Sequence, residues 1–317
     1  MCGGLRRRTG REEAVFSSSN GDVTRRLRIW GLGCRSFLAY FRRLSTTAVE
    51  SLLATVFPGN CRFCNAPLAR IGRIPLCLAC LNAIRGLQGP VCAICGDRLL
   101  GEPGGERRCL ECIRTERPFT RAIAYGNYEG GLRALIHLLK YQQVRPAAAV
   151  LGRMLAEPVA GLLEADAGAS VVVVPVPLHQ KKQRQRGFNQ TELIARAMVK
   201  HLALPGLQVD ASLLRRCRAT ESQTGLSRSL RQVNVHGAFA VLSPGRIAHR
   251  DILLVDDVFT TGTTVSECAR LLRRTGAHRV WVATVARVIA SEAAFIQFRE
   301  QQAGSKPVEL LTRAAEA

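Results

Sequence analysis

The chain has 317 residues, which is long enough for two domains with hydrophobic cores of ordinary size. Lys and Arg number 45 against 24 Asp and Glu, so the formal net charge is +21, which favours polyanionic partners, nucleic acid first. Part of this charge lies in residues 1–45, a basic segment with ten Arg and three acidic residues that we expect to be a disordered tail.

Aromatic residues are few and are not interleaved with the basic runs, so the sequence predicts no stacking surface for single-stranded nucleic acid. No apolar run is long enough to span a bilayer, and arginines stand where a signal peptide would need its apolar core. We therefore expect a cytoplasmic protein, without a membrane span, whose twelve cysteines are reduced.

Residues 46–116 are predicted to hold a helix at 47–57 and then a small cysteine-rich module. Two CxxC pairs can direct four thiolates at one ion, so the pattern predicts two closed, structural Zn²⁺ sites. Consecutive pairing gives ribbons at 61–80 and 92–112, although crossed pairing stays open. Asn65 and Gly96 follow the first and third pairs, and both residue types tolerate the left-handed backbone of a metal knuckle. The predicted ligands are Cys61, Cys64, Cys77, Cys80, Cys92, Cys95, Cys109 and Cys112.

Disulfides and a redox motif are the alternatives for these cysteines. Disulfides fit the expected compartment poorly, and the fourfold repetition of CxxC argues against a redox motif.

Residues 117–290 alternate between strand and helix patterns, which predicts an α/β domain built on a twisted, mostly parallel sheet flanked by helices. The strands are predicted at 121–128, 171–174, 252–255 and 280–285, and helices at 132–141, 152–163, after 189, and at 265–274. Lys140, at the end of one helix, could reach an anionic ligand or could simply complement the helix dipole. Residues 291–317 are expected to form a polar, partly helical tail.

A basic segment, HQKKQRQRGFNQ, follows the apolar strand 171–174 and precedes a helix that Asn189 can cap. A cationic loop at a strand's C-terminal end, facing a helix N-terminus, suits a pyrophosphate. The candidate contacts here are Val176, Pro177, His179 and Arg186. A solvated basic run is the alternative, and a lone histidine such as His179 is more often structural than catalytic. Residues 213–239 are polar and could form either a mobile lid over the phosphates or a surface loop.

The segment 252–264, ILLVDDVFTTGTT, is the most informative part of the chain. Its four apolar residues suit a buried parallel strand, at whose C-terminal end Asp256 and Asp257 follow. The turn after them can close its backbone N–H groups around an anion, helped by the positive end of the next helix. A capping box from Thr264 to Glu267 places the start of that helix. The candidate phosphate contacts are Thr260, Thr261, Gly262, Thr263 and Thr264.

This segment resembles the phosphoribosyl-pyrophosphate signature of type I phosphoribosyltransferases, except that Phe259 is bulkier than expected. From Val49 to about Arg287 the chain resembles the ComF family, in which a double zinc ribbon precedes a domain of that fold. The resemblance rests on the CxxC pairs and on LKYQ (139–142), VPVPLH and RQRGFNQ (174–190), SQTGLSR (222–228), NVHGAF (234–239) and VDDVFTTGTT.

The resemblance implies a protein associated with natural competence and the handling of imported single-stranded DNA. Asp256 and Asp257 would hold the ribose hydroxyls, the threonine turn the 5′-phosphate, and the basic segment the pyrophosphate with Mg²⁺. Two classes of function remain open: an enzyme that transfers phosphoribose, including a nucleobase phosphoribosyltransferase of salvage metabolism, and a non-catalytic module that binds DNA or competence-machinery proteins. Fold alone cannot decide between them.

Overall fold

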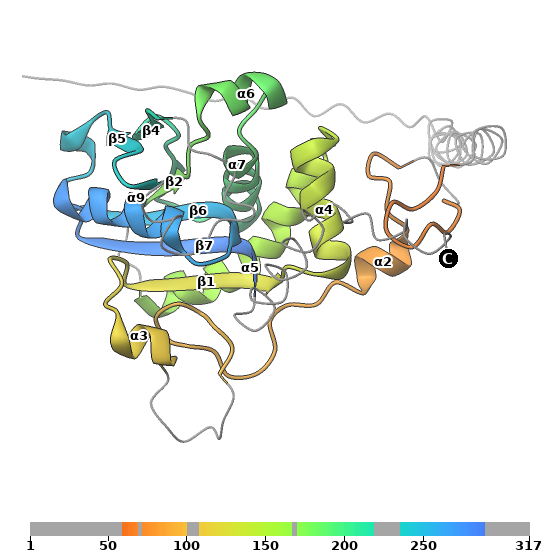
Figure 1. The fold of residues 1–317 in the computed structure, drawn as a ribbon, viewed down its shortest axis with the longest axis horizontal. Coiled ribbons are helices and arrows are strands. Elements are labelled where there is room, and N and C mark those ends of the chain that lie inside the picture. The colour runs from red at the N-terminus through yellow and green to blue at the C-terminus, as the bar shows by residue number, and fades with distance from the viewer. Residues whose placement is uncertain (1–58, 69–71, 100–107, 167–169, 219–234, 289–317) are drawn as a thin grey trace, which may run out of the picture. The chain divides into compact units, whose positions relative to one another are not determined.

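The computed structural model describes residues 59–68, 72–99, 108–166, 170–218 and 235–288 (Figure 1). All of them belong to Gly59–Ala317, one of the two units into which the chain divides. The predictions for the basic tail, the helix at 47–57, most of the lid segment and the C-terminal tail concern residues outside the described ranges.

A five-stranded, fully parallel sheet forms the centre of this unit, which confirms the predicted fold class. In spatial order its strands are β1 (Arg121–Asn127), β7 (Arg279–Arg287), β6 (Asp251–Phe259), β2 (Val171–Pro175) and β3 (Leu207–Val209). A separate antiparallel pair, β4 (Leu214–Arg216) and β5 (Phe239–Val241), lies near α9 in Figure 1. The apolar segment 252–255 is therefore the middle of the central strand, buried on both faces.

Helices cover both faces of the sheet (Figure 1). Alternation along β6 sends Leu253 and Val255 toward one core, which contains residues of α4 (Gly130–Tyr141), α5 (Ala147–Asp166) and α7 (Gln190–Leu202). Ile252 and Leu254 enter the other core, beside residues of α9 (Thr263–Arg274). Full burial of each such side chain contributes about 1.5–3 kcal/mol relative to exposure, so this alternation fixes the register of β6.

The cysteine-rich module covers the free edge of β1. The backbone N–H of Ala122 donates to the carbonyl oxygen of Ile94 at 2.7 Å, and that of Leu87 donates to the carbonyl oxygen of Tyr125 at 2.7 Å. Residues of the ribbon at 61–80, whose last cysteine lies in α2 (Leu78–Asn82), join the core under α4 and α5. Those of the ribbon at 92–112, whose last cysteine lies in α3 (Leu110–Arg114), join the core under α9. The two ribbons therefore pack on opposite faces of the sheet and leave its edge strand paired.

Two local expectations need correction. The basic segment after β2 is a short helix, α6 (Gln180–Arg186), which ends at Gly187 with a positive φ of 76°. Helix α9 is not started by a capping box, because Gly262 is its N-cap and no side chain caps it. Glu267 has other partners: it accepts a hydrogen bond from the backbone N–H of Gly237 at 3.0 Å and pairs with Arg270. No helix in the described part of the chain is long and apolar enough to cross a membrane.

Candidate functional site

The acidic pair lies inside β6 rather than after it. The ladder between β6 and β2 ends where Val255 pairs with Pro175, whereas the ladder to β7 continues as far as Phe259 and Arg287. Asp256 and Asp257 thus stand beyond the end of β2, paired on one side only. This position is the carboxyl edge of a parallel sheet, where α/β proteins bind ligands. Because successive side chains of a strand alternate, the two carboxylates leave β6 toward opposite faces.

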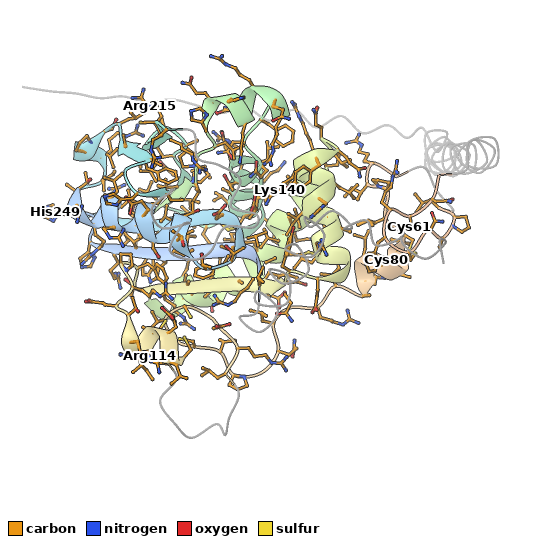
Figure 2. All side chains as sticks on the ribbon, in the orientation of Figure 1. Cys61, Cys80, Arg114, Lys140, Arg215 and His249 are labelled. Atoms are coloured by element: carbon orange, nitrogen blue, oxygen red, sulfur yellow. The ribbon has the colours of Figure 1, made fainter. Side chains whose placement is uncertain are left out.

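Asp257 is the buried member of the pair and is held by two polar side chains. Lys140, labelled in Figure 2, stands at the end of α4 with its Nζ 2.7 Å from Oδ1 of Asp257. Gln190 Nε2, at the start of α7, donates to Oδ2 at 2.7 Å. Burial alone would lower the pKa of Lys140, but the charge of Asp257 outweighs it and keeps that pKa above its ordinary value. Lys140 therefore lies beside the acidic pair, and its contact with an anionic ligand stays a prediction.

Asp256 is partly exposed and has a different electrostatic environment. Burial, together with the negative charge of Asp257, raises the pKa of Asp256 to about 7. The same carboxylate accepts a hydrogen bond from the backbone N–H of Asp257 at 2.8 Å. A carboxyl group with a pKa near neutrality, at the carboxyl ends of parallel strands, is typical of a functional position.

The threonine turn connects β6 to the N-terminus of α9. Gly262 has a φ of +75°, and a Cβ at this position would overlap the ring of Phe259, so only glycine fits without rearrangement. The hydroxyls of Thr261 and Thr263 lie 2.8 Å apart, and Thr260 and Thr264 are partly exposed. The first N–H groups of a helix have no partner within it, so the start of α9 offers donors to an anion.

The second candidate phosphate region lies after β2. The carbonyl oxygen of Val176 accepts hydrogen bonds from Thr191 Oγ1 at 2.7 Å and Asn189 Nδ2 at 3.2 Å, which fixes the strand end against α7. His179 caps α6 by accepting a hydrogen bond from the backbone N–H of Lys181 at 3.3 Å, which is a structural role. Pro177, between them, is partly exposed.

Cations gather around this region. Arg186 donates to Oε1 of Gln190 at 2.9 Å and is thereby linked to Asp257. The pKa of Lys182 is lowered, first by burial and then by the positive charges of Arg216, Arg186 and Lys140. The positive charges gathered around Lys182 favour an anionic ligand.

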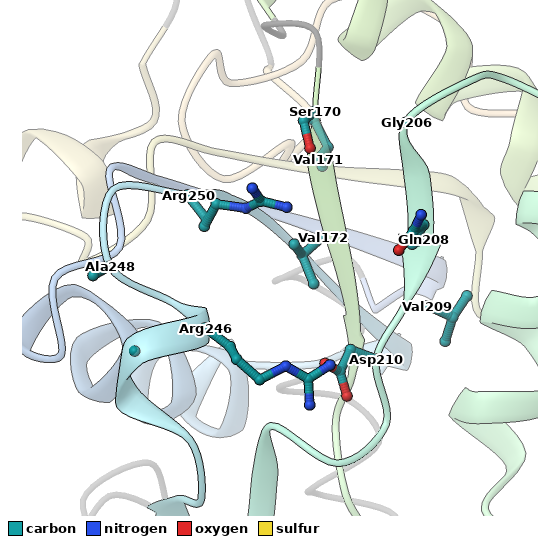
Figure 3. Close-up of a pocket in the computed structure, with 11 residues that line it drawn as sticks. Ser170, Val171, Val172, Gly206, Gln208, Val209, Asp210, Arg246, Ala248 and Arg250 are labelled. Carbon is teal, nitrogen blue, oxygen red and sulfur yellow. The ribbon is translucent and has the colours of Figure 1, made fainter.

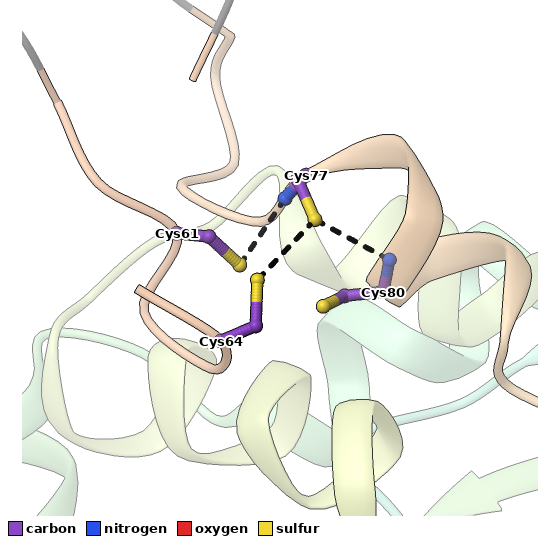
Figure 4. A group of neighbouring side chains, drawn as sticks. All are labelled: Cys61, Cys64, Cys77 and Cys80. Atoms are coloured by element: carbon purple, nitrogen blue, oxygen red, sulfur yellow. Dashed lines mark hydrogen bonds between the residues drawn. The ribbon is translucent and has the colours of Figure 1, made fainter. Parts of the chain in front are cut away.

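The eight cysteines of the CxxC pairs form two groups of four, which answers the pairing question. The first tetrad is Cys61, Cys64, Cys77 and Cys80 (Figure 4), and the second is Cys92, Cys95, Cys109 and Cys112. Within each tetrad all sulfur atoms lie within 4.8 Å of one another. The Sγ atoms of Cys64 and Cys77 are 3.7 Å apart, and those of Cys95 and Cys109 are 3.6 Å apart.

These spacings fit a tetrahedral metal. Sulfur ligands at about 2.3 Å from zinc lie about 3.8 Å from one another. Asn65 (φ 59°) and Gly96 (φ 72°) have the left-handed conformation expected of metal knuckles. The backbone N–H of Cys77 points at Sγ of Cys61, and that of Cys109 at Sγ of Cys92, both at 3.3 Å. Each tetrad could therefore hold one metal ion, with consecutive pairs as ligands.

Comparisons with known proteins agree with this architecture. Residues 191–295 match the model of the phosphoribosyl transferase domain family. The chain is 34% identical over 238 residues to the DNA utilization protein YhgH of Escherichia coli strain K12, covering 73% of this chain and 98% of that protein. Competence protein F of Haemophilus influenzae is 30% identical over 233 residues, with the same shares covered. The chain belongs to the ComF family. A further relative, competence protein ComFC of Bacillus subtilis, is 22% identical over 207 residues, covering 63% of this chain and 79% of that protein.

Three residues of this ComF-family site were not singled out by the sequence. Gln190 holds Asp257, Arg216 lies within electrostatic reach of Asp256, and Arg287 links the second tetrad to the turn. Gln190 ends the RQRGFNQ motif, so the motif pointed to its position without showing what it contacts. Arg216 lies in the basic run 215–218 and Arg287 ends β7, and nothing in the sequence distinguishes either from the chain's other arginines.

A cavity of about 480 Å³ lies elsewhere in this ComF-family chain (Figure 3). It is lined by the start of β2, by β3 with its flanking residues, and by residues of the segment 245–250, with the ion pair of Arg246 and Asp210 at one rim. None of the predicted site residues lines it. The candidate site is therefore the carboxyl edge of the sheet and not this cavity.

Proposed function

We propose that this protein binds phosphoribosyl pyrophosphate at the carboxyl edge of its sheet. The observation that carries the proposal is the placement of the acidic pair of β6 directly before a glycine-containing turn at the N-terminus of α9. Carboxylates accept hydrogen bonds from sugar hydroxyls, and the start of a helix takes a phosphate. Together the two groups could hold the sugar and the phosphate of one ribose 5-phosphate.

In this proposal the ribose hydroxyls bind Asp256 and Asp257. Each oxygen of Asp257 already accepts one hydrogen bond and keeps a second lone pair for a hydroxyl. Asp256, which is more exposed, accepts the other hydroxyl once it has lost its proton. The turn from Thr260 to Thr264 binds the 5′-phosphate.

The pyrophosphate would lie over the segment Val176–His179, near Lys140 and Arg186, and would bring Mg²⁺ with it. Departure of pyrophosphate gives an oxocarbenium-like state at the ribose, so transfer requires positioned charge more than a protein nucleophile. The cations around Lys182 supply such charge for the leaving group. An acceptor would be recognised by other parts of the chain.

The two tetrads are proposed to hold one structural Zn²⁺ each. Four thiolates favour zinc, and a site with four protein ligands has no open position for catalysis. Each ribbon contributes side chains to a core of the sheet domain, so zinc would stabilise that domain as well as its own loop.

Calorimetric titration with three ligands in the presence of Mg²⁺ tests the binding proposal. Phosphoribosyl pyrophosphate should bind more tightly than either ribose 5-phosphate or pyrophosphate, because only the first engages both phosphate regions. If pyrophosphate alone bound as tightly as phosphoribosyl pyrophosphate, the acidic pair and the threonine turn would contribute nothing to binding. The absence of binding by all three ligands would refute the proposal.

A second candidate function is the binding of single-stranded DNA, with or without transfer chemistry. It is favoured by the net charge of +21 and by relatives whose names refer to DNA utilization and competence. Titration of a labelled single strand at several salt concentrations should give an affinity that falls steeply with salt. Repeating the titration with phosphoribosyl pyrophosphate shows whether the two ligands are coupled. An affinity independent of salt, or no binding at low salt, would exclude this function.

A further inference from the structure

A cluster of rings stands on α4 next to the candidate ribose site. Arg133, His137 and Tyr141 follow one another at intervals of four residues, so they share one face of the helix. The rings of His137 and Tyr141 are 5.1 Å apart, and those of Tyr128 and His137 are 6.3 Å apart. The hydroxyl of Tyr128 lies 2.9 Å from Nε2 of His137, which fixes the orientation of the inner two rings. We call these four residues, together with Arg186 of α6, the α4 ring surface.

Arginines flank the rings at both ends. The guanidinium carbon of Arg133 is 5.8 Å from the centroid of Tyr128, and that of Arg186 is 5.5 Å from the centroid of Tyr141. Both distances are within the range of a cation–π interaction. A row of rings flanked by cations suits a single strand, because bases stack on the rings while cations meet the phosphates.

Tyr141 is the outermost ring and has no packing role that explains it. Its exposed fraction is 66%, although a large ring is usually at least half buried. The neighbouring residue Lys140 reaches Asp257, and Arg186 reaches the same carboxylate through Gln190. The α4 ring surface is therefore continuous with the candidate ribose site.

The imidazole ring of His137 is held in its neutral form. Burial, followed by the positive charges of Arg133 and Lys140, lowers the pKa of His137. Near neutral pH His137 thus adds a flat, uncharged ring between the two tyrosines, and the positive charge of the surface comes from its arginines. An anionic strand with exposed bases complements this combination.

We propose that the α4 ring surface stacks the bases of single-stranded DNA and leads the strand to the phosphoribosyl site. The inference rests on the DNA-binding part of the proposed function and assigns that part to one surface. A flat apolar protein partner would gain little from the two arginines. Single-stranded DNA uses both features.

The test measures binding of a fluorescein-labelled oligothymidylate and the fluorescence of a strand containing 2-aminopurine, which is sensitive to base stacking. Tyr141→Ala should weaken strand binding by about tenfold and should abolish the 2-aminopurine change. Tyr141→Trp should retain both signals, because it keeps a flat ring. Tyr141 has no hydrogen bond to the acidic pair, but Arg186 stacks on its ring. Affinity for phosphoribosyl pyrophosphate should therefore remain native in Tyr141→Trp and should fall less than strand binding in Tyr141→Ala.

Arg133→Gln tests the cationic part, with Arg114→Gln on α3 as the matched control. Both arginines are exposed, and Figure 2 labels Arg114 far from Lys140. Loss of Arg133 should weaken strand binding and reduce the slope of log affinity against log salt concentration by about one. Loss of Arg114 should change neither quantity.

The outcomes separate this inference from the proposed function. Native strand binding in Tyr141→Ala, with the 2-aminopurine change intact, would overturn the assignment of the surface while DNA binding itself stood. Failure of the unmodified full chain to bind the strand would overturn both. Equal effects of the Arg133 and Arg114 substitutions would show a diffuse electrostatic attraction in place of a defined surface.

Discussion

The guanidinium of Arg287 lies 4.5 Å from the centroid of the Phe259 ring and donates a hydrogen bond to the carbonyl oxygen of Cys95. Its Nε also donates to Oδ1 of Asp97 at 3.1 Å. The Phe259 ring in turn packs beneath Gly262. One buried arginine therefore connects the second tetrad to the turn that we propose binds the 5′-phosphate.

Arg287→Lys tests this connection. Lysine keeps the charge but cannot stack or donate in several directions as a guanidinium does. We expect a stability loss of about 1–3 kcal/mol and a roughly tenfold loss in affinity for phosphoribosyl pyrophosphate. Arg279→Lys is the matched control at the opposite end of β7, where Arg279 stacks on Trp281 at 4.8 Å and pairs with Asp251 at 2.7 Å. Arg279→Lys should lower stability without changing affinity for phosphoribosyl pyrophosphate. If the two substitutions changed this affinity equally, the connection through Arg287 would be contradicted.

Gly262→Ala tests the fit of the threonine turn. The added Cβ is strained by the positive φ and also overlaps the Phe259 ring. We expect a stability loss of about 1–3 kcal/mol and weaker phosphate binding. Gly237→Ala separates the two causes, because Gly237 has a φ of +66° but no atom within 4 Å of an added Cβ. If Gly262→Ala is no worse than Gly237→Ala in thermal denaturation, the contact with Phe259 is unimportant.

The raised pKa of Asp256 predicts how stability depends on pH. Between its ordinary value of 3.8 and about 7, the folded chain keeps a proton that the unfolded chain releases. Stability contributed by this group therefore falls as pH rises through that window and is lowest above it. Asp256→Asn should stabilise the chain by about 1–3 kcal/mol at pH 8 and have little effect near pH 4.

Asp251→Asn, at the start of the same strand, is the control of opposite sign. Burial alone would raise the pKa of Asp251, but hydrogen bonds from Arg279 and His278 outweigh it and lower that pKa. Its contribution to stability is present above its unfolded pKa and is lost as pH falls, so this variant should be destabilised at pH 8. Denaturant unfolding at both pH values measures the difference. If the stability changes of Asp256→Asn and Asp251→Asn had the same sign and the same pH dependence, the environment assigned to Asp256 would be contradicted.

Elemental analysis should find about two zinc ions per chain. Cys64→Ser and Cys109→Ser should each remove one ion, since each belongs to a different tetrad. Cys217→Ser is the control, because Cys217 is exposed and outside both tetrads. A single ion in the unmodified chain would leave one tetrad without a metal role, and no ion would contradict both sites.

Local signals were sufficient for much of the fold and for the centre of the site. The acidic pair and the threonine turn occur within one strand–turn–helix, and each tetrad lies within about twenty residues. Such features depend on chain neighbours, so their order in the sequence reports their arrangement in space. The tetrad pairing was left open because the three intervals between the four CxxC pairs are similar.

Contacts between distant segments could not be predicted in the same way. Lys140 and Asp257 are separated by 117 positions, and Arg287 and Cys95 by 192. The sequence also predicted no stacking surface, since aromatic and basic residues are not interleaved along the chain. The α4 ring surface arises because a helical interval of four residues aligns Arg133, His137 and Tyr141, and because α6 brings Arg186 to them.

The most direct test of the central claim is a calorimetric titration of Mg²⁺–phosphoribosyl pyrophosphate into the unmodified chain and into the double variant Asp256→Asn, Asp257→Asn. Asparagine keeps the size of each side chain. It removes the negative charge of the carboxylate that would accept hydrogen bonds from the ribose hydroxyls. We predict saturable binding to the unmodified chain and no measurable heat with the double variant, while circular dichroism shows both to be folded. Equal affinity of the two proteins would contradict a ribose site at the acidic pair of β6.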